Sequence, residues 1–112
     1  MLYAAIALFA ISAILGITIL LKWLNSKDAS KGVIYSHGIV AAIALVLLIV
    51  YAVSNPANFP KASIILFVIG ALVGFYMFFN DLRKRASPLA VALVHALFAV
   101  AGLVALLIFV FA

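Results

Sequence analysis

The chain has 112 residues, a net charge of +5, no cysteine, and 71% hydrophobic residues against 8% charged ones. An ordinary soluble domain is about half apolar, so this composition excludes a soluble globular protein. The absence of cysteine excludes disulfides, iron–sulfur clusters and thiolate zinc sites. The basic residues are spread over short segments between apolar runs, a pattern that indicates membrane topology and not nucleic-acid binding.

Four apolar runs are long enough for a transmembrane helix, which needs about 20 residues. We place them at about 2–24, 32–53, 61–80 and 87–111, within a single membrane domain that covers residues 1–112. Turn-forming and charged residues cluster in the segments between them. The sequence therefore predicts an all-α integral membrane protein whose four helices form an up-down-up-down bundle in the lipid bilayer.

The distribution of lysine and arginine predicts the orientation of this bundle. The first and third connecting regions carry three basic residues each, whereas the middle one carries only Lys61. The positive-inside rule then places the first and third loops in the cytoplasm and both termini outside. We expect a multi-pass protein of the inner or plasma membrane.

The two halves of the chain are similar to each other. A shift of 58 residues places His37 on His95 and Gly16 on Gly74 without a gap. These pairs carry weight because the chain has only two histidines and six glycines. The similarity predicts two duplicated helical hairpins, in repeat halves 1–54 and 59–112. Both hairpins start on the same side, so their pseudo-twofold axis would run along the membrane normal.

His37 and His95 lie inside apolar runs, where ionisable residues are functional candidates by default. The second and fourth helices are diagonal in the predicted bundle, and neighbouring axes about 8–10 Å apart imply a diagonal of about 11–14 Å. This separation would keep the two imidazole rings apart and suits axial ligands on opposite faces of one haem iron. Two histidines complete the axial set of a haem, but they are too few for a zinc or di-iron site.

Several other residues are candidates for the same site. Ala41 and Ala99 follow the histidines by one helical turn, and small side chains there would leave space for a flat macrocycle. Gly16 and Gly74 are expected at a similar depth on the first and third helices. The further candidates are propionate partners and a nearby hydrogen bonder: Lys31, Arg85 and Tyr35.

With His37 in VIYSHGIVAA and His95 in ALVHALFAVAG, the sequence resembles the small four-helix membrane cytochromes of the b type. The resemblance covers the whole chain as architecture, and its motif is these two residues. Members such as the cytochrome b561 group carry two histidine pairs, for haems near opposite faces. The single pair here implies one haem b near the cytoplasmic side. The resemblance implies electron transfer, with a quinone or another membrane subunit as partner, rather than a stand-alone enzyme.

Two other classes of function fit parts of the sequence. A cofactor-free accessory subunit of a larger membrane complex would have its histidines directed at different neighbours. Small-xxx-small spacings such as Ser12 with Gly16 and Gly70 with Gly74 are common in plain helix packing. A small transporter of similar length is the weakest alternative, because no Asp or Glu lies within a predicted span.

Overall fold

The computed structural model describes all 112 residues and consists of four helices, α1 (Leu2–Leu24), α2 (Lys31–Ser54), α3 (Lys61–Leu82) and α4 (Leu89–Phe111). All four are long and apolar enough to span a membrane. At a rise of 1.5 Å per residue each is about 33–36 Å long, a little more than the hydrocarbon core of a bilayer. The prediction of an all-helical chain with four candidate spans is confirmed.

The helix ends differ slightly from the predicted ones for local chemical reasons. α4 starts at Leu89 and not at residue 87, because Pro88 has an extended backbone and disfavours a helical residue before it. α3 continues to Leu82 because the polar residues that follow its apolar run still adopt helical geometry. α2 begins after Ser30, whose hydroxyl oxygen accepts a hydrogen bond of 3.4 Å from the backbone N–H of Val33.

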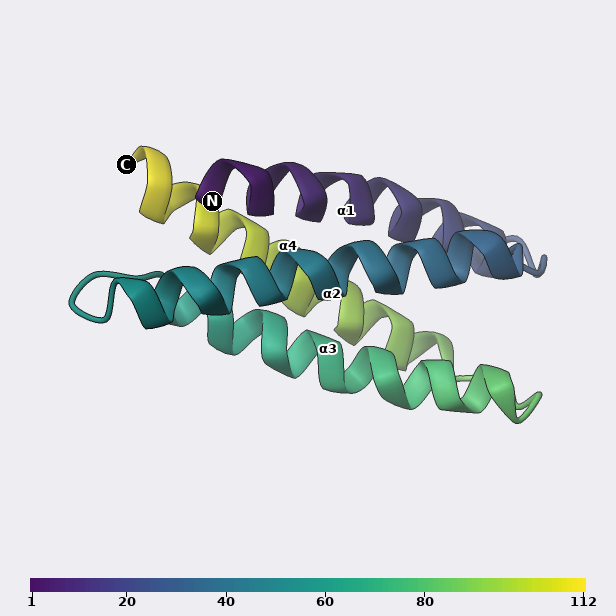
Figure 1. Cartoon of the computed structure of the whole chain (residues 1–112). Helices are drawn as coiled ribbons and strands as arrows, with labels where there is room; N and C mark the ends of the chain where they lie inside the picture. The colour runs from purple at the N-terminus through teal and green to yellow at the C-terminus, as the bar shows by residue number, and fades with distance from the viewer.

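Consecutive helices lie side by side and are connected at alternating ends (Figure 1). The α1–α2 and α3–α4 loops lie at one end, which we call the loop end, and both termini lie at the other. α1 packs along α2 and α3 along α4, with a smaller contact between α1 and α4 and a slight one between α2 and α3. α2 is therefore diagonal to α4, and α1 is diagonal to α3.

The contact between α2 and α3 is reinforced at the loop end. Lys31 Nζ lies 2.5 Å from Asp81 Oδ2, in the only ion pair of the structure. One turn along the same helices, the rings of Tyr35 and Phe78 meet edge to face with centroids 5.8 Å apart. These two contacts join the hairpins where their helices otherwise touch little.

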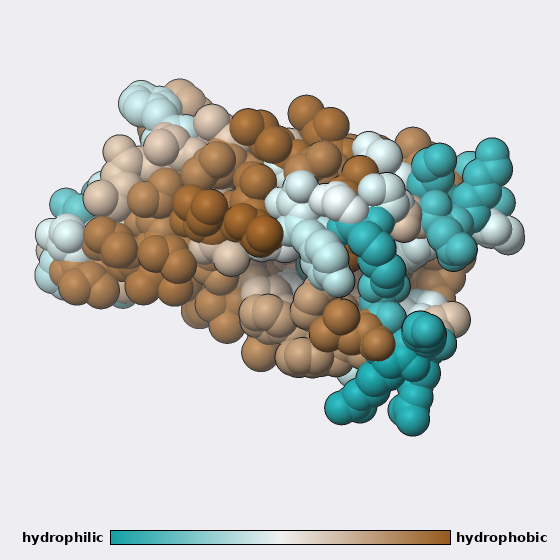
Figure 2. All heavy atoms as spheres, turned by 45° about the vertical axis from the view of Figure 1, so that its right-hand side comes forward, coloured by the Kyte–Doolittle hydropathy of each residue, from teal (hydrophilic) through white to brown (hydrophobic).

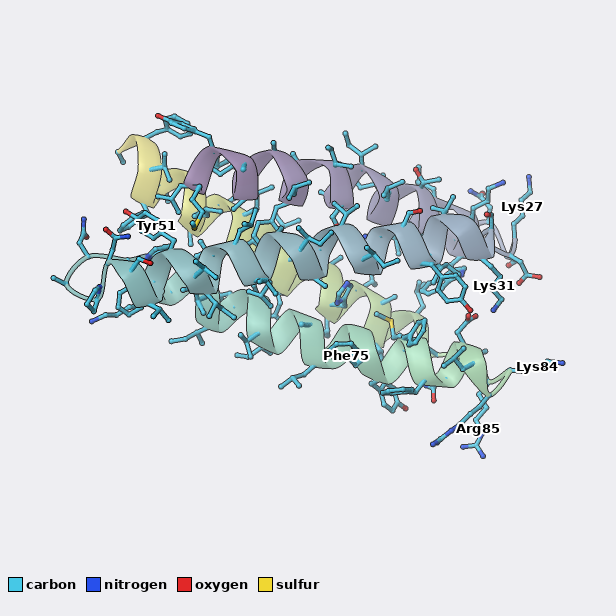
Figure 3. The ribbon with its side chains drawn as sticks, in the orientation of Figure 1. Lys27, Lys31, Tyr51, Phe75, Lys84 and Arg85 are labelled. Atoms are coloured by element: carbon cyan, nitrogen blue, oxygen red, sulfur yellow. The ribbon has the colours of Figure 1, made fainter.

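The surface of the bundle is largely apolar along its length (Figure 2). Large side chains on all four helices are more than half exposed, among them Ile14, Ile39, Leu72 and Leu97. Polar and charged side chains gather at the loop end, where Lys27, Lys31, Lys84 and Arg85 extend outward (Figure 3). Such a surface suits a lipid environment.

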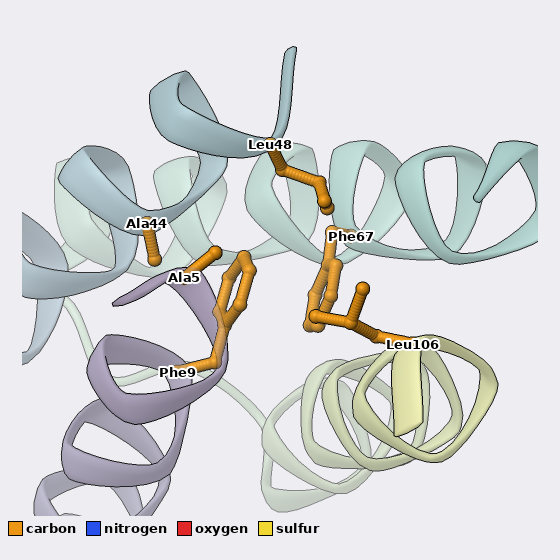
Figure 4. Packing of buried hydrophobic residues seen from close by; sticks show 6 residues of the cluster. All are labelled: Ala5, Phe9, Ala44, Leu48, Phe67 and Leu106. Carbon is orange, nitrogen blue, oxygen red and sulfur yellow. The ribbon is translucent and has the colours of Figure 1, made fainter. Parts of the chain in front are cut away.

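The core is centred on two aromatic rings that meet across the α1–α3 diagonal. Phe9 and Phe67 stack with centroids 3.8 Å apart and an interplanar angle of 4° (Figure 4). A Cβ atom at Gly102 would lie 2.9 Å from the Phe67 ring, so α4 needs glycine at this position for the ring to fit. Ala5, Ala44, Leu48 and Leu106 complete this cluster.

The two hairpins bury the same positions. Of the 14 buried residues, all but Pro60 and Ala92 have a buried counterpart at an offset of 58 residues. The pairs are Ala5 with Ser63, Phe9 with Phe67, Ser12 with Gly70, Ile19 with Met77, Ala44 with Gly102, and Leu48 with Leu106. The packing inside one hairpin is thus repeated in the other.

α1 and α3 also end in the same way. Ser26 and Lys84, again 58 residues apart, are the only non-glycine residues with positive φ, at 55° and 56°. In both turns the next backbone N–H donates a 2.8 Å hydrogen bond to a carbonyl five residues earlier, Lys27 to Lys22 and Arg85 to Asn80. This is the Schellman geometry, in which glycine is the usual left-handed residue.

Ser26→Gly and Lys84→Gly should each stabilise the protein by about 1 kcal/mol, because a side chain in the left-handed region costs about 1–2 kcal/mol. Ser36→Gly, at an exposed helical position of α2, is the matched control and should cost about 0.5–1 kcal/mol. Thermal unfolding in detergent, followed by circular dichroism, measures all three. Lower stability in both turn variants would contradict the assigned geometry.

Candidate functional site

The two histidines meet at the centre of the bundle. His37 on α2 and His95 on α4 have ring centroids 6.0 Å apart and ring planes at 82°. Helix spacing alone predicts that the diagonal holds the two rings apart. That expectation is wrong for this structure, because both side chains point inward and together span the diagonal.

One ring nitrogen of each histidine is already engaged. Nδ1 of His37 lies 2.8 Å from the carbonyl oxygen of Ser12, and Nδ1 of His95 lies 2.7 Å from that of Gly70. A carbonyl can only accept, so these contacts assign the proton of each neutral imidazole to Nδ1. The partners Ser12 and Gly70 are themselves equivalent positions of the two hairpins.

The first hairpin has an additional polar contact. The Ser12 hydroxyl lies 3.0 Å from Nδ1 of His37 and donates to the backbone carbonyl of the same histidine over 3.1 Å. Ser12 is buried, with 3% of its surface exposed. The serine and the histidine thus link α1 to α2 by a reciprocal pair of hydrogen bonds, which Gly70 does not provide in the second hairpin.

Glycines form the surface on which the imidazoles rest. A Cβ atom at Gly16 would lie 3.0 Å from Cε1 of His37, and one at Gly74 would lie 3.0 Å from Cε1 of His95. Both glycines therefore lie at the depth of the histidines, as predicted. The space over them is filled by the imidazole rings, so their predicted contact with a macrocycle stays a prediction.

The free ring nitrogens define what the site can bind. With Nδ1 donating to a carbonyl, Nε2 of each histidine keeps its lone pair and forms no hydrogen bond within the chain. Metal-ligating histidines are usually held this way, with the second nitrogen donating to a carbonyl or carboxylate. No cluster of three or more His, Cys, Asp or Glu residues is present, so the pair has no further ligand for a bare ion.

The donor set and its separation fit a haem iron. Metal–imidazole bonds of about 2 Å on each side, with about 1 Å from each nitrogen to its ring centroid, place two imidazoles about 6 Å apart on one ion. The observed centroids are separated by 6.0 Å. Haem needs only one or two axial ligands from the protein, which is what this site supplies.

The remaining predicted site residues lie farther from the pair. Ala41 and Ala99 are half-buried, one turn beyond the histidines. Lys31 and Tyr35 belong to the α2–α3 contact, where Lys31 is paired with Asp81. Arg85 is exposed in the α3–α4 loop and forms no ion pair. Their roles toward a cofactor stay predictions.

Comparison with known proteins returns no match: no family model, no curated protein and no solved structure matches this chain. The resemblance to b-type membrane cytochromes therefore rests on the sequence alone.

Sequence reasoning missed two contributors to the site. The small-xxx-small spacing predicts only a packing role for Ser12, but a serine one turn from Gly16 is well placed to bond a histidine at that depth. Phe9 and Phe67 are also 58 residues apart, but a matched pair of apolar residues gives no signal of ring stacking in so apolar a chain. The stack lies two turns from Gly16 and Gly74 and closes the core on the side of the termini.

Gly16→Ala and Gly74→Ala should each destabilise the protein by about 1–2 kcal/mol, because the hydrogen-bonded rings cannot move aside and overpacking outweighs the gain in helix propensity. Gly38→Ala is the matched control, since nothing lies within 4 Å of a Cβ atom there. It should be neutral or stabilising by up to about 1 kcal/mol. Unfolding in detergent measures the differences, and equal effects at all three glycines would contradict the assigned packing.

Proposed function

We propose that this protein is a membrane haem b protein with bis-histidine ligation that acts in electron transfer. The observation that carries the proposal is the facing pair of imidazoles, 6.0 Å apart, with both Nδ1 atoms committed and both Nε2 atoms free. A haem held by two histidines supplies one-electron redox chemistry without an open position for oxygen. The partner would be a quinone or another membrane subunit, because the loops between the helices are short and leave little surface for a soluble partner.

The proposal includes a topology. The four helices cross the inner or plasma membrane in alternating directions, with the loop end in the cytoplasm and both termini outside. The basic residues at the loop end support this orientation through the positive-inside rule. The two hairpins arose by duplication, an origin supported by the six buried pairs and by the matched turns at Ser26 and Lys84.

Each residue of the site has a defined role in this proposal. His37 and His95 hold the iron through Nε2, while Ser12 and Gly70 fix the ring orientations through their carbonyls. Arg85 forms no ion pair and would bind one haem propionate. Lys31 would have to give up its contact with Asp81 to bind the other propionate. Tyr35 lies on the loop-end side of the pair, whereas Ala41 and Ala99 lie one turn beyond it, where small side chains would leave space for the macrocycle.

A cofactor-free role in helix packing is the second candidate. It is favoured by the close fit of each imidazole over the glycine of the facing helix in its own hairpin, since the ring already fills the space over that glycine. In that case the protein would be an accessory subunit whose histidines join its helices. The contact between the two rings argues against an accessory subunit in which each histidine points toward a different neighbouring protein.

Visible spectra of the detergent-purified protein, oxidised and dithionite-reduced, distinguish these functions. We expect sharp α and β bands on reduction, lost in both His37→Ala and His95→Ala because each removes one axial ligand. Gly38→Ala, beside His37 but without close neighbours, is the control and should keep the bands. A colourless protein from haem-supplemented cells would reject haem binding and leave the packing role.

The proposed topology has its own test. The chain has no cysteine, so a single cysteine introduced at Lys27 or Asn58 reports one loop alone. In intact cells a membrane-impermeant maleimide should label Asn58→Cys and should label Lys27→Cys only after the cells are opened. The reverse pattern would place the loop end outside the cell.

A further inference from the structure

A polar recess lies between α1 and α2 at the loop end, away from the histidines. It has a volume of about 380 Å³ and is lined by Thr18, Lys22, Asp28, Ala29, Ser30 and Val33. Sites for small molecules have volumes of about 300–1,000 Å³, so the recess is large enough for a small polar group. One cation and one anion thus line the same hollow at the edge of the apolar part of the bundle.

The two charges in this recess are not used by the fold. The only ion pair of the structure joins Lys31 to Asp81, so Lys22 and Asp28 pair neither with each other nor with another residue. Asp28 is one of only two acidic residues in the chain, and the other is already engaged. A ligand that carries both a negative and a positive group would complement this pair.

The corresponding place in the other hairpin is different. A recess between α3 and α4 shares two equivalent positions with the first, because Tyr76 and Val91 correspond to Thr18 and Val33. All six of its lining residues are hydrophobic: Leu72, Val73, Tyr76, Ala90, Val91 and Val94. The two recesses overlap only in part, and the counterparts of Lys22 and Asp28 in the second hairpin are the uncharged Asn80 and Ala86, so the paired charges are particular to the first hairpin.

We propose that the α1–α2 recess binds the zwitterionic phosphoethanolamine headgroup of a membrane phospholipid. The Lys22 ammonium would donate to a phosphate oxygen, and the headgroup ammonium would donate to the Asp28 carboxylate. The Ser30 oxygen accepts from Val33 N–H, so its own O–H remains available for the phosphate. Thr18 donates its hydroxyl proton to the Ile14 carbonyl at 3.0 Å, which leaves its oxygen free to accept from the headgroup ammonium.

The position of the recess indicates that the headgroup belongs to a membrane lipid and not to a soluble molecule. Ile17 and Leu21, on the same stretch of α1 as Thr18 and Lys22, are more than half exposed and offer an apolar surface to acyl chains. A soluble metabolite with the same headgroup would gain nothing from that surface. This inference depends on the helices lying in a bilayer and is independent of haem binding.

The chain provides a local probe for the test, because Trp23 is its only tryptophan and adjoins Lys22. We would reconstitute the protein in bilayers that contain phosphatidylethanolamine, phosphatidylcholine or phosphatidylglycerol with brominated acyl chains, and measure quenching of Trp23. Ethanolamine and choline headgroups have the same net charge, but only ethanolamine can donate hydrogen bonds to Asp28. We expect the ethanolamine lipid to be enriched over the choline lipid by about two- to fivefold, the factor that one exposed ion pair provides.

Variants separate the proposed contacts. Asp28→Asn should bring the ethanolamine-to-choline ratio close to one, whereas Asp81→Asn, the matched control at the other carboxylate, should leave it unchanged. Lys22→Gln should weaken both lipids because both carry the phosphate. His37→Ala and His95→Ala should leave the ethanolamine-to-choline ratio unchanged. The lipid proposal is therefore tested separately from the haem proposal. Circular dichroism confirms that each variant retains its helices.

Four results would overturn the proposal. The first is equal quenching by the ethanolamine and choline lipids, and the second is a ratio unaffected by Asp28→Asn. The third is preference for phosphatidylglycerol, which would indicate general attraction of anionic lipid to the basic loop end. Displacement of the lipid by excess soluble phosphoethanolamine would reject the membrane source of the headgroup.

Discussion

A polar imidazole in an apolar bundle must find an acceptor for its N–H group, and this requirement organises the structure. An unsatisfied polar group in hydrocarbon costs several kcal/mol. Here a backbone carbonyl of the neighbouring helix in the same hairpin serves each histidine, Ser12 for His37 and Gly70 for His95. The bond fixes how α1 packs on α2 and how α3 packs on α4. It also directs the second nitrogen of each ring away from the carbonyl it bonds.

The glycines and phenylalanines follow from the same constraint. For an imidazole to reach a carbonyl on the facing helix, that helix must approach closely, and Gly16 and Gly74 permit this approach. The rings then meet across one diagonal, and the Phe9–Phe67 stack joins the other diagonal two turns away. The hairpins are therefore connected through their centre. This arrangement explains why the contact between α2 and α3 can remain slight, with Lys31 and Asp81 holding its loop end.

The features that could be predicted from the sequence are those that depend on hydropathy along the chain and on rare residue types. Hydropathy located the four helices, and the rarity of histidine and glycine in this chain drew attention to His37, His95, Gly16 and Gly74, which the structure brings together. The sequence could not predict the ring contact, because helix spacing alone does not say how far two inward side chains reach. It also could not predict the left-handed turns that follow α1 and α3, since Ser26 and Lys84 are not the glycines that usually mark such turns. The recess at Lys22 and Asp28 depends on how a loop folds over a helix, which no periodic pattern encodes.

The central claim is that both histidines donate from Nδ1 to a carbonyl, keep Nε2 unprotonated, and bring their rings into contact. Solid-state NMR of protein with ¹⁵N-labelled histidine, prepared without haem in bilayers, tests it directly, because only two residues contribute signals. The account predicts that both rings are protonated at Nδ1 and unprotonated at Nε2, with through-space contacts between the two rings. Protonation at Nε2 in either residue, or the absence of contact between the rings, would contradict it.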